Sequence, residues 1–109
     1  MAAIHRGRVL ETVTDGAAFA WFRAQGLTPH TWSNAPGDAY APHAHDYLKV
    51  LLCMRGGIVF HTAEGDVALR PGDRLDVEPG TLHSATVGAE GVACMEAAAE
   101  PGGPRKDPA

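Results

Sequence analysis

The sequence predicts an all-β protein, a barrel or sandwich of short strands preceded by one short helix. Of its 109 residues, 13 are glycine and 8 are proline, and 45% are hydrophobic. Many of the glycines and prolines lie in turn signals, which separate short runs rich in Val, Leu, Ile and Thr. Short strands separated by closely spaced turns are typical of sandwiches and small barrels.

The helix is expected near the N-terminus, over about residues 17–25. Thr14 or Asp15 is the expected N-cap, and Gly26 is expected to end the helix. Apolar residues at spacings of three and four give it one apolar face, made of Ala18, Phe19 and Phe22 with Trp21 on the flank. We therefore expect this helix to cover a sheet from outside.

Seven strands are expected after the helix. Their ranges are 28–33, 47–54, 58–62, 67–70, 74–78, 82–87 and 92–98. Residues 100–109 contain no aliphatic or aromatic residue apart from the terminal alanine, which is typical of a disordered tail. The expected organisation is an N-terminal extension with a short helix over 1–26, a barrel over 27–98 and a disordered tail over 99–109.

Charge and hydropathy exclude several classes of partner. Nine basic residues against 13 acidic ones give a net charge of −4, which argues against nucleic acid and anionic membranes. No run approaches the roughly 18 apolar residues of a membrane span, and the N-terminus lacks the apolar region of a secretory signal. We expect a soluble cytoplasmic protein in which Cys53 and Cys94 are reduced and mostly buried.

Three of the six histidines are spaced as metal ligands. His43 and His45 are two residues apart, and residues i and i+2 of a strand point to the same face. His83 follows the turn at Pro79-Gly80 and is expected on a strand that faces the first pair. Three imidazoles with one or two waters can hold a divalent first-row metal and leave positions open for substrate.

The spacing of these residues is similar to the two motifs of the cupin superfamily. The first run is Gly37, five residues, His43-Ala44-His45, three residues, Lys49, six residues and Gly56. The second is Gly72, five residues, Glu78-Pro79-Gly80, two residues and His83. Three positions depart from the family: Lys49 replaces the usual glutamate, Glu78 the usual proline and Val87 the usual asparagine. The resemblance covers about residues 27–98.

The resemblance implies a small single-domain cupin, a double-stranded β-helix or jelly-roll barrel. It also implies one divalent ion held by His43, His45 and His83, and a homodimer. Family members catalyse dioxygenation, isomerisation, decarboxylation and lyase reactions. Imidazole ligands do not distinguish Fe, Ni, Zn, Mn and Cu, so the metal stays open.

Lys49 is the departure with the largest physical consequence. An ammonium about 5 Å from a divalent ion is repelled by roughly 6–7 kcal/mol at an effective dielectric constant of 20. Three arrangements would remove this repulsion: Lys49 points away from the ion, Lys49 is uncharged, or the site holds no metal. The side chain is a candidate to receive an anionic substrate or to act as an amine base or nucleophile. Alternatively, it is solvated or paired with a carboxylate such as Asp46 or Glu96.

Weaker candidates complete the expected pocket. Alternation along the strand places Cys53 on the same face as Lys49, and Glu96 could supply a missing carboxylate. Tyr47 is expected at the pocket rim together with Trp32 and Tyr40. His61 is expected to point away from the site, and His5 and His30 are left unassigned.

Two classes of function agree with these features. The first is a metal-dependent dioxygenase, isomerase or lyase acting on a small, anionic molecule, with Lys49 steadying its negative charge. The second is a module that binds or senses a small molecule or a metal without turnover. A cupin without any ligand is a third, weaker alternative.

Overall fold

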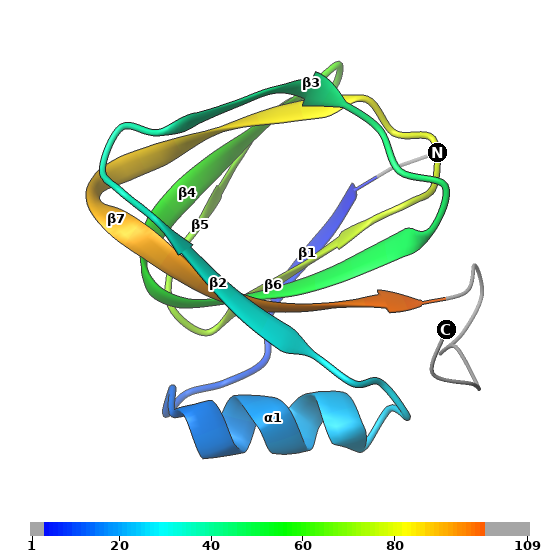
Figure 1. Cartoon of the computed structure of the whole chain (residues 1–109), viewed down its shortest axis with the longest axis vertical. Coiled ribbons are helices and arrows are strands. Elements are labelled where there is room, and N and C mark those ends of the chain that lie inside the picture. Colours follow the sequence, from blue (N-terminus) through cyan, green and yellow to red (C-terminus); the bar gives the residue numbers. More distant parts are fainter. Residues whose placement is uncertain (1–3, 100–109) are drawn as a thin grey trace.

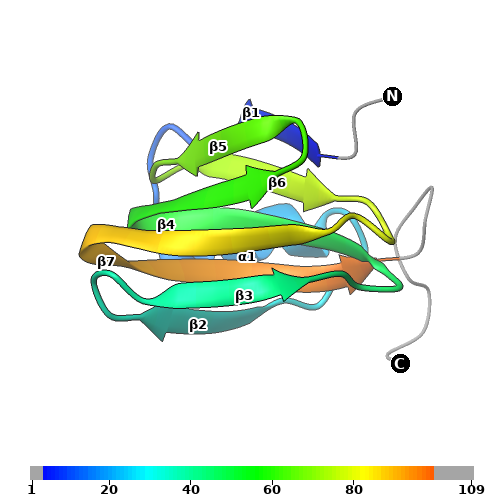
Figure 2. The ribbon, with the colours of Figure 1, turned by 90° about the horizontal axis from the view of Figure 1, so that it is seen from above.

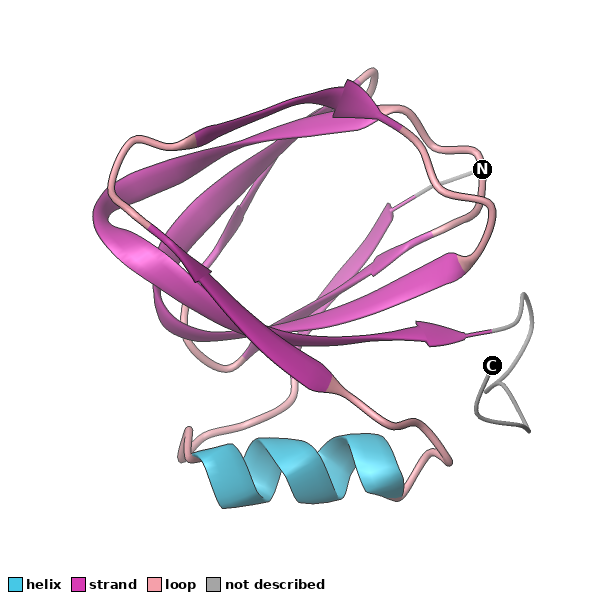
Figure 3. Ribbon diagram, in the orientation of Figure 1, coloured by secondary structure: helices cyan, strands magenta, loops and turns pink. Residues whose placement is uncertain are grey.

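The expected all-β fold with a short N-terminal helix is confirmed by the computed structural model, which describes residues 4–99 (Figures 1 and 3). The elements in chain order are β1 (Ile4–Arg8), α1 (Asp15–Arg23), β2 (His30–Asn34), β3 (Ala39–His43), β4 (Leu48–Thr62), β5 (Gly65–Leu69), β6 (Asp73–Val77) and β7 (His83–Ala99). Within residues 4–99, no helix has the length and hydropathy needed to cross a membrane. The expected tail beyond residue 99 lies outside the described residues.

Two long antiparallel strands, β4 and β7, belong to both sheets of the barrel. The first half of β4 pairs with the last half of β7. This pair lies in the middle of a sheet with the order β1-β6-β4-β7-β2. The last half of β4 pairs with the first half of β7 in the second sheet, where β5 pairs with β4 and β3 pairs with β7. Both strands therefore pass from one sheet into the other, and the sheets curve around a common interior (Figures 1 and 2).

Glycines permit the bend at which β4 and β7 change sheet. The register between the strands shifts twice within residues 53–58, between Cys53 and Arg55 and between Gly56 and Ile58, as it does at β-bulges. Gly56 has a φ of 72°, and a Cβ at this position would collide with the carbonyl oxygen of Gly91. Gly91 itself has a φ of 77°. The bend thus requires close approach of two backbones in conformations that other residues rarely adopt.

This bend also explains where the predicted strands are wrong. Strands expected over 47–54 and 58–62 are one strand, β4, and those expected over 82–87 and 92–98 are one strand, β7. The glycines between them indicated turns but instead bend continuous strands. In addition, β1 and β3 were not predicted. β1 adds an edge strand from the segment that was expected to be an extension.

The helix packs against the outside of one sheet, as expected (Figure 1). Thr14 is the N-cap and accepts a hydrogen bond from the Ala17 amide at 3.1 Å. The helix spans 15–23, about two residues earlier than expected at each end. Phe22 is fully buried, whereas Phe19 was wrongly expected on the apolar face and is 49% exposed.

The residues of β4 alternate between two separate apolar clusters. The outer core lies between α1 and the sheet; its buried members are Ala18, Phe22, Leu27, Val50, Leu52, Met54, Met95, Ala97 and Ala99. The inner core lies between the two sheets; its buried members are Leu51, Cys53, Ile58, Phe60, Leu69, Leu75, Val77, Ala85, Val87, Val92 and Cys94. This alternation directs Lys49, two residues before Leu51, toward the barrel interior.

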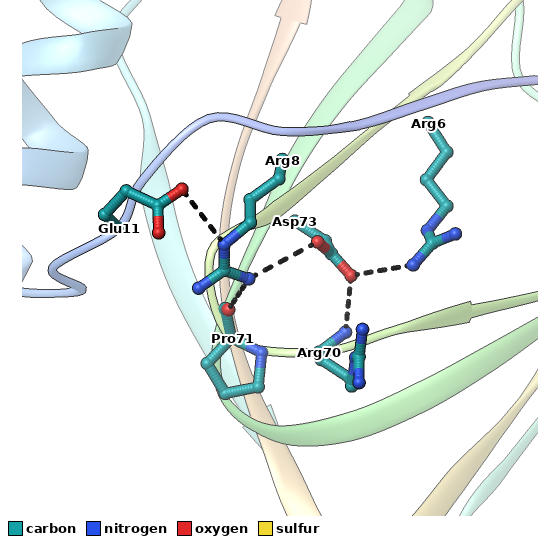
Figure 4. Close-up of polar contacts among 6 residues, drawn as sticks. All are labelled: Arg6, Arg8, Glu11, Arg70, Pro71 and Asp73. Carbon is teal, nitrogen blue, oxygen red and sulfur yellow. Dashed lines mark hydrogen bonds and ion pairs between the residues drawn. The ribbon is translucent and has the colours of Figure 1, made fainter.

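A network around a buried carboxylate fastens β1 to β6. Asp73 is 3% exposed and accepts hydrogen bonds from the Arg70 amide at 2.9 Å and from Arg6 Nη2 at 3.2 Å (Figure 4). Arg8 Nη1 lies 3.7 Å from the other carboxylate oxygen and donates to the Pro71 carbonyl at 2.9 Å. A buried charge needs such partners, so this network is an integral part of the fold.

Candidate metal centre and adjoining cavity

Three histidines converge where the end of β3 meets the start of β7. His43 is the last residue of β3, His83 is the first residue of β7, and the two are paired in register. His45 lies in the loop before β4 and not on a strand, as had been expected. The ring centroid of His43 lies 4.8 Å from that of His45 and 4.4 Å from that of His83. Candidate ligand atoms from the three rings all lie within 4.8 Å of one another.

Backbone carbonyls orient two of the rings. His43 Nδ1 lies 2.8 Å from the Ala41 carbonyl oxygen, and His83 Nδ1 lies 2.9 Å from that of Thr81. Because a carbonyl oxygen only accepts, Nδ1 is the donor in each neutral ring and Nε2 carries the lone pair. The Nε2 atoms of His45 and His83 are buried and have no hydrogen-bond partner within the described part of the chain. Buried polar atoms are rarely left unsatisfied, so these lone pairs fit a bound cation.

The surroundings of His45 and His83 favour their neutral forms by lowering the pKa of each ring. Burial is the largest cause that lowers the pKa of His83, and the charges of His43 and Lys49 lower it further against the opposing hydrogen bond from Thr81. Burial likewise lowers the pKa of His45, followed by the charge of Lys49. Since a neutral imidazole is the form that binds a metal, the donor set fits a divalent first-row ion.

Lys49 forms an ion pair with Glu96. Lys49 Nζ lies 3.4 Å from Glu96 Oε1, and both side chains are 12% exposed. The Trp32 indole donates to the same oxygen at 2.6 Å, and His30 Nε2 lies 3.9 Å from Glu96 Oε2. Glu96 is one of the two carboxylates proposed from sequence as a partner for Lys49, and the other, Asp46, is exposed.

A cavity of about 310 Å³ adjoins His43 and the ion pair. Its lining residues are His30, Trp32, Tyr40, His43, Lys49, Phe60, Ala85 and Glu96. The rings of Trp32 and Tyr40 pack edge to face at 6.0 Å, and the Tyr40 hydroxyl donates to the Asn34 side chain. The cavity therefore combines aromatic walls with a charged pair and one candidate metal ligand, a composition suited to a small molecule with a polar end.

The other residues expected in the pocket lie at different depths. Tyr47 packs on His45, with ring centroids 4.8 Å apart and planes tilted by 32°. Cys53 is fully buried in the inner core, directly opposite Cys94, and both thiols are free. The neighbouring Cys53 thiol and burial raise the pKa of Cys94, so this thiol stays protonated. Tyr47 therefore supports a candidate ligand, whereas Cys53 belongs to the packing below the cavity.

Sequence reasoning missed three cavity residues, His30, Phe60 and Ala85. His30 is paired in register with Glu96, so the pairing of β2 with β7 is the signal that would have found it. His61 was expected to point away from the site, and its ring contacts other residues although it follows the cavity residue Phe60 in the chain. Its Nδ1 lies 2.8 Å from Asp66 Oδ1 and its Nε2 lies 2.9 Å from Thr86 Oγ1, so both of its nitrogens have partners.

The double-sheet barrel and its two motifs define the class of the protein, a small cupin domain. The chain belongs to the AraC-like ligand binding domain family, whose model matches residues 27–95. No curated protein sequence matches it significantly.

Solved structures share the fold at low sequence identity. A protein of unknown function from Rhizobium leguminosarum bv. viciae 3841 superposes with a TM-score of 0.63 at 18% identity, covering 68% of this chain and 70% of that one. A cupin-2 domain containing protein from Shewanella frigidimarina NCIMB 400 gives 0.57 at 17% identity, with coverages of 65% and 68%. A chain from the crystal structures of the DMSP lyases RdDddP and RnDddQII gives 0.61 at 21% identity, with coverages of 68% and 38%.

Proposed function

We propose that this chain binds one divalent metal ion through His43, His45 and His83 and takes a small, anionic molecule into the adjoining cavity. The observation that carries the proposal is that the Nε2 atoms of His45 and His83 are buried and have no hydrogen-bond partner among residues 4–99. A bound ion would accept these lone pairs and remove the energetic penalty of leaving them unsatisfied. The ion would be Fe, Ni, Zn, Mn or Cu, since all of these accept imidazole.

The residues around the ion have distinct proposed roles. The Ala41 and Thr81 carbonyls hold the rings of His43 and His83 in the orientation that metal binding needs. When bound, a divalent ion supplies Lewis acidity and open coordination positions. Lys49 would attract and steady the negative charge of the bound molecule, which is the proposed catalytic contribution of this residue.

Catalysis of dioxygenase, isomerase or lyase type is the first form of this proposal. A metal next to a cavity of about 310 Å³ with a lysine in its wall is an arrangement that can bind and polarise a small oxygen-containing substrate. The fold shared with a chain from DMSP lyase structures supports including lyase substrates among the compounds tested.

Ligand binding without turnover is the second form. It is favoured by the family, which is described as a ligand binding domain. In this form the same cavity and ion pair hold a small anion, and the bound state rather than a product is the output. The two forms share the metal centre and differ only in whether the bound molecule reacts.

Elemental analysis of protein purified without a histidine tag tests the metal centre. We expect a stoichiometric divalent metal in the wild type and its loss in both His43→Ala and His83→Ala. His61→Ala is the matched control, because His61 has partners for both ring nitrogens outside the site. A wild type that stays free of metal after incubation with each candidate ion would contradict the proposal.

A compound panel separates catalysis from binding. Small thiols, diketones, sugar acids and DMSP would be offered to the metal-loaded protein while oxygen uptake and product formation are followed. Turnover that disappears in His83→Ala supports an enzyme. Calorimetric binding of a compound without turnover supports the ligand-binding form.

Three expectations from sequence remain proposals. These are the division of the chain at residues 26 and 98, a cytoplasmic location and a homodimer. Light scattering during size-exclusion chromatography tests the homodimer directly. A single species at the mass of one 11.4 kDa chain would contradict it.

A further inference from the structure

We propose that Glu96 is a positioning residue that holds the Lys49 ammonium away from the three histidines, so that a divalent ion can bind between them. The proposal rests on the metal centre proposed above and adds the reason why a lysine is compatible with it. Its central observation is the 3.4 Å contact between Lys49 Nζ and Glu96 Oε1 within the cavity that His43 also lines.

Lys49 is close enough to the histidines to compete with a metal. Lys49 and His43 line the same cavity, and the rings of His45 and His83 lie within 4.8 Å of the His43 ring, centroid to centroid. An ammonium group carries three donors and no acceptor, and the Nε2 atoms of His45 and His83 are buried without a partner among residues 4–99. That of His83 is an acceptor, because its Nδ1 donates to the Thr81 carbonyl. If released, Lys49 could donate to these atoms and would also repel a divalent ion electrostatically.

Glu96 is held in place more firmly than Lys49. The backbones of both residues are paired on two sides, but the Glu96 side chain has further contacts: the Trp32 indole donates to Oε1 at 2.6 Å, and His30 Nε2 lies 3.9 Å from Oε2. Lysine, by contrast, has a flexible four-carbon stem. The ion pair therefore fixes the mobile ammonium against an anchored carboxylate. Asp46 is exposed and no contact with Lys49 is seen for it within the described residues.

The pair also sets the charge that an incoming molecule meets. Lys49 and Glu96 together contribute no net charge, and an imidazole contributes none in the form that binds a metal. A bound divalent ion therefore leaves the cavity with a net charge of about +2, which attracts an anion. Without Glu96 the same cavity would hold an uncompensated ammonium and would disfavour the ion itself.

Binding of Co²⁺ and Zn²⁺ to four forms of the full chain tests the proposal: wild type, Glu96→Gln, Lys49→Met and the double variant. Glutamine retains an oxygen for the Trp32 indole, and methionine retains most of the lysine stem. We expect Glu96→Gln to lower the association constant by on the order of 30-fold in the wild-type background. In the Lys49→Met background the same substitution should lower it by only a few-fold, because no ammonium is released.

This non-additivity separates positioning from a simple charge effect. If Glu96 acted only through its own negative charge, its removal would weaken binding equally in both backgrounds, and that result would overturn the proposal. Equal affinity of Glu96→Gln and the wild type would overturn it too. Glu64→Gln, in an exposed turn, is the control for loss of a distant carboxylate, and thermal unfolding confirms that each variant is folded.

The outcomes also distinguish this proposal from the one on which it rests. If neither the wild type nor Lys49→Met binds either ion, the metal centre itself is wrong and the role of Glu96 falls with it. If the wild type binds metal and the effects are additive, the metal centre stands and only the positioning role is wrong. Binding by Lys49→Met alone would mean that Glu96 fails to keep the ammonium away, which also overturns the positioning role.

Discussion

Asp73 and His83 are both buried polar residues, but only Asp73 has its polar atoms satisfied by the chain. Asp73 is the first residue of β6 and is 3% exposed; His83 follows the turn after β6 and is 2% exposed. The Asp73 carboxylate receives the Arg70 amide and Arg6, whereas His83 Nε2 is buried without a partner among residues 4–99. The difference teaches where to look for function: the partners of Asp73 belong to the fold, whereas His83 leaves one nitrogen for the ion that we propose.

The largest expected effect sharpens this comparison from the side of His83. Replacing His83 by alanine should lower the affinity for Zn²⁺ by roughly 100- to 1000-fold, since apparent binding energies of about 10–16 kcal/mol are shared among about four ligands. Competition with a chromophoric chelator measures the loss. The unfolding temperature of the variant should no longer rise on addition of Zn²⁺, whereas that of the wild type should. A normal Zn²⁺-dependent rise in the variant would contradict the prediction.

Substitution of Asp73 should have the opposite pattern. Asp73→Ala removes the shared partner of Arg6, Arg8 and the Arg70 amide, and we expect the free energy of unfolding to fall by about 2 kcal/mol. The loss is smaller than for a fully buried pair because both arginines are about half exposed. Denaturant unfolding measures it, and Zn²⁺ affinity should be unchanged. Weakened metal binding in a folded variant would break the comparison.

A smaller effect concerns the dependence of stability on pH in the metal-free protein. Burial lowers the pKa of His45 and His83 in the folded state, so below about pH 6.5 the unfolded chain binds protons that the folded chain does not. Stability should therefore be retained above that pH and fall below it, by up to about 1.4 kcal/mol per pH unit and per histidine. Unfolding at about pH 7.5 and about pH 5.5 should show a smaller decrease for His83→Ala than for the wild type. Equal decreases would contradict it.

The smallest expected effect comes from a histidine that has partners. His61 contacts Asp66 and Thr86 through its two nitrogens and is partly exposed. Surface interactions of this kind contribute about 0–1 kcal/mol, so His61→Ala should change stability by less than about 1 kcal/mol. Metal content should not change. A loss of metal in His61→Ala would show that unsatisfied nitrogens do not identify the ligands.

The metal candidates could be predicted from sequence because they depend on local spacing. The spacing of His43, His45 and His83 along the chain is similar to the two cupin motifs, and the three rings lie together in the structure even though His45 is not on a strand. Thr14 and Gly26 marked the ends of the helix through chemistry that is local to each end, and Gly26 has the expected positive φ of 76°. Signals that act within a few residues were therefore readable.

Features that depend on tertiary pairing were not readable. β3 contains Pro42, which weakens a strand signal, and the sequence does not show that β7 pairs with it. The Glu96 contacts with Trp32 and His30 depend on the register between β2 and β7. In the same way, no local signal tells a glycine that ends a strand from one, such as Gly56, that bends it.

The bend in β7 also determines how wide the cavity is. His83 and Glu96 are 13 residues apart on this single strand, and a straight strand of that length would span roughly 43 Å, more than the 34 Å longest dimension of the molecule. Glu96 and His43, the register partner of His83, nevertheless line one cavity, because β7 turns back on itself (Figure 1), between Val87 and Val92, where its register with β4 shifts. The angle of that turn thus sets the separation between the metal ligands and the ion pair. Cupin domains of this build could adapt to larger or smaller molecules by changing the curvature of one strand, with every residue that touches the ligand unchanged.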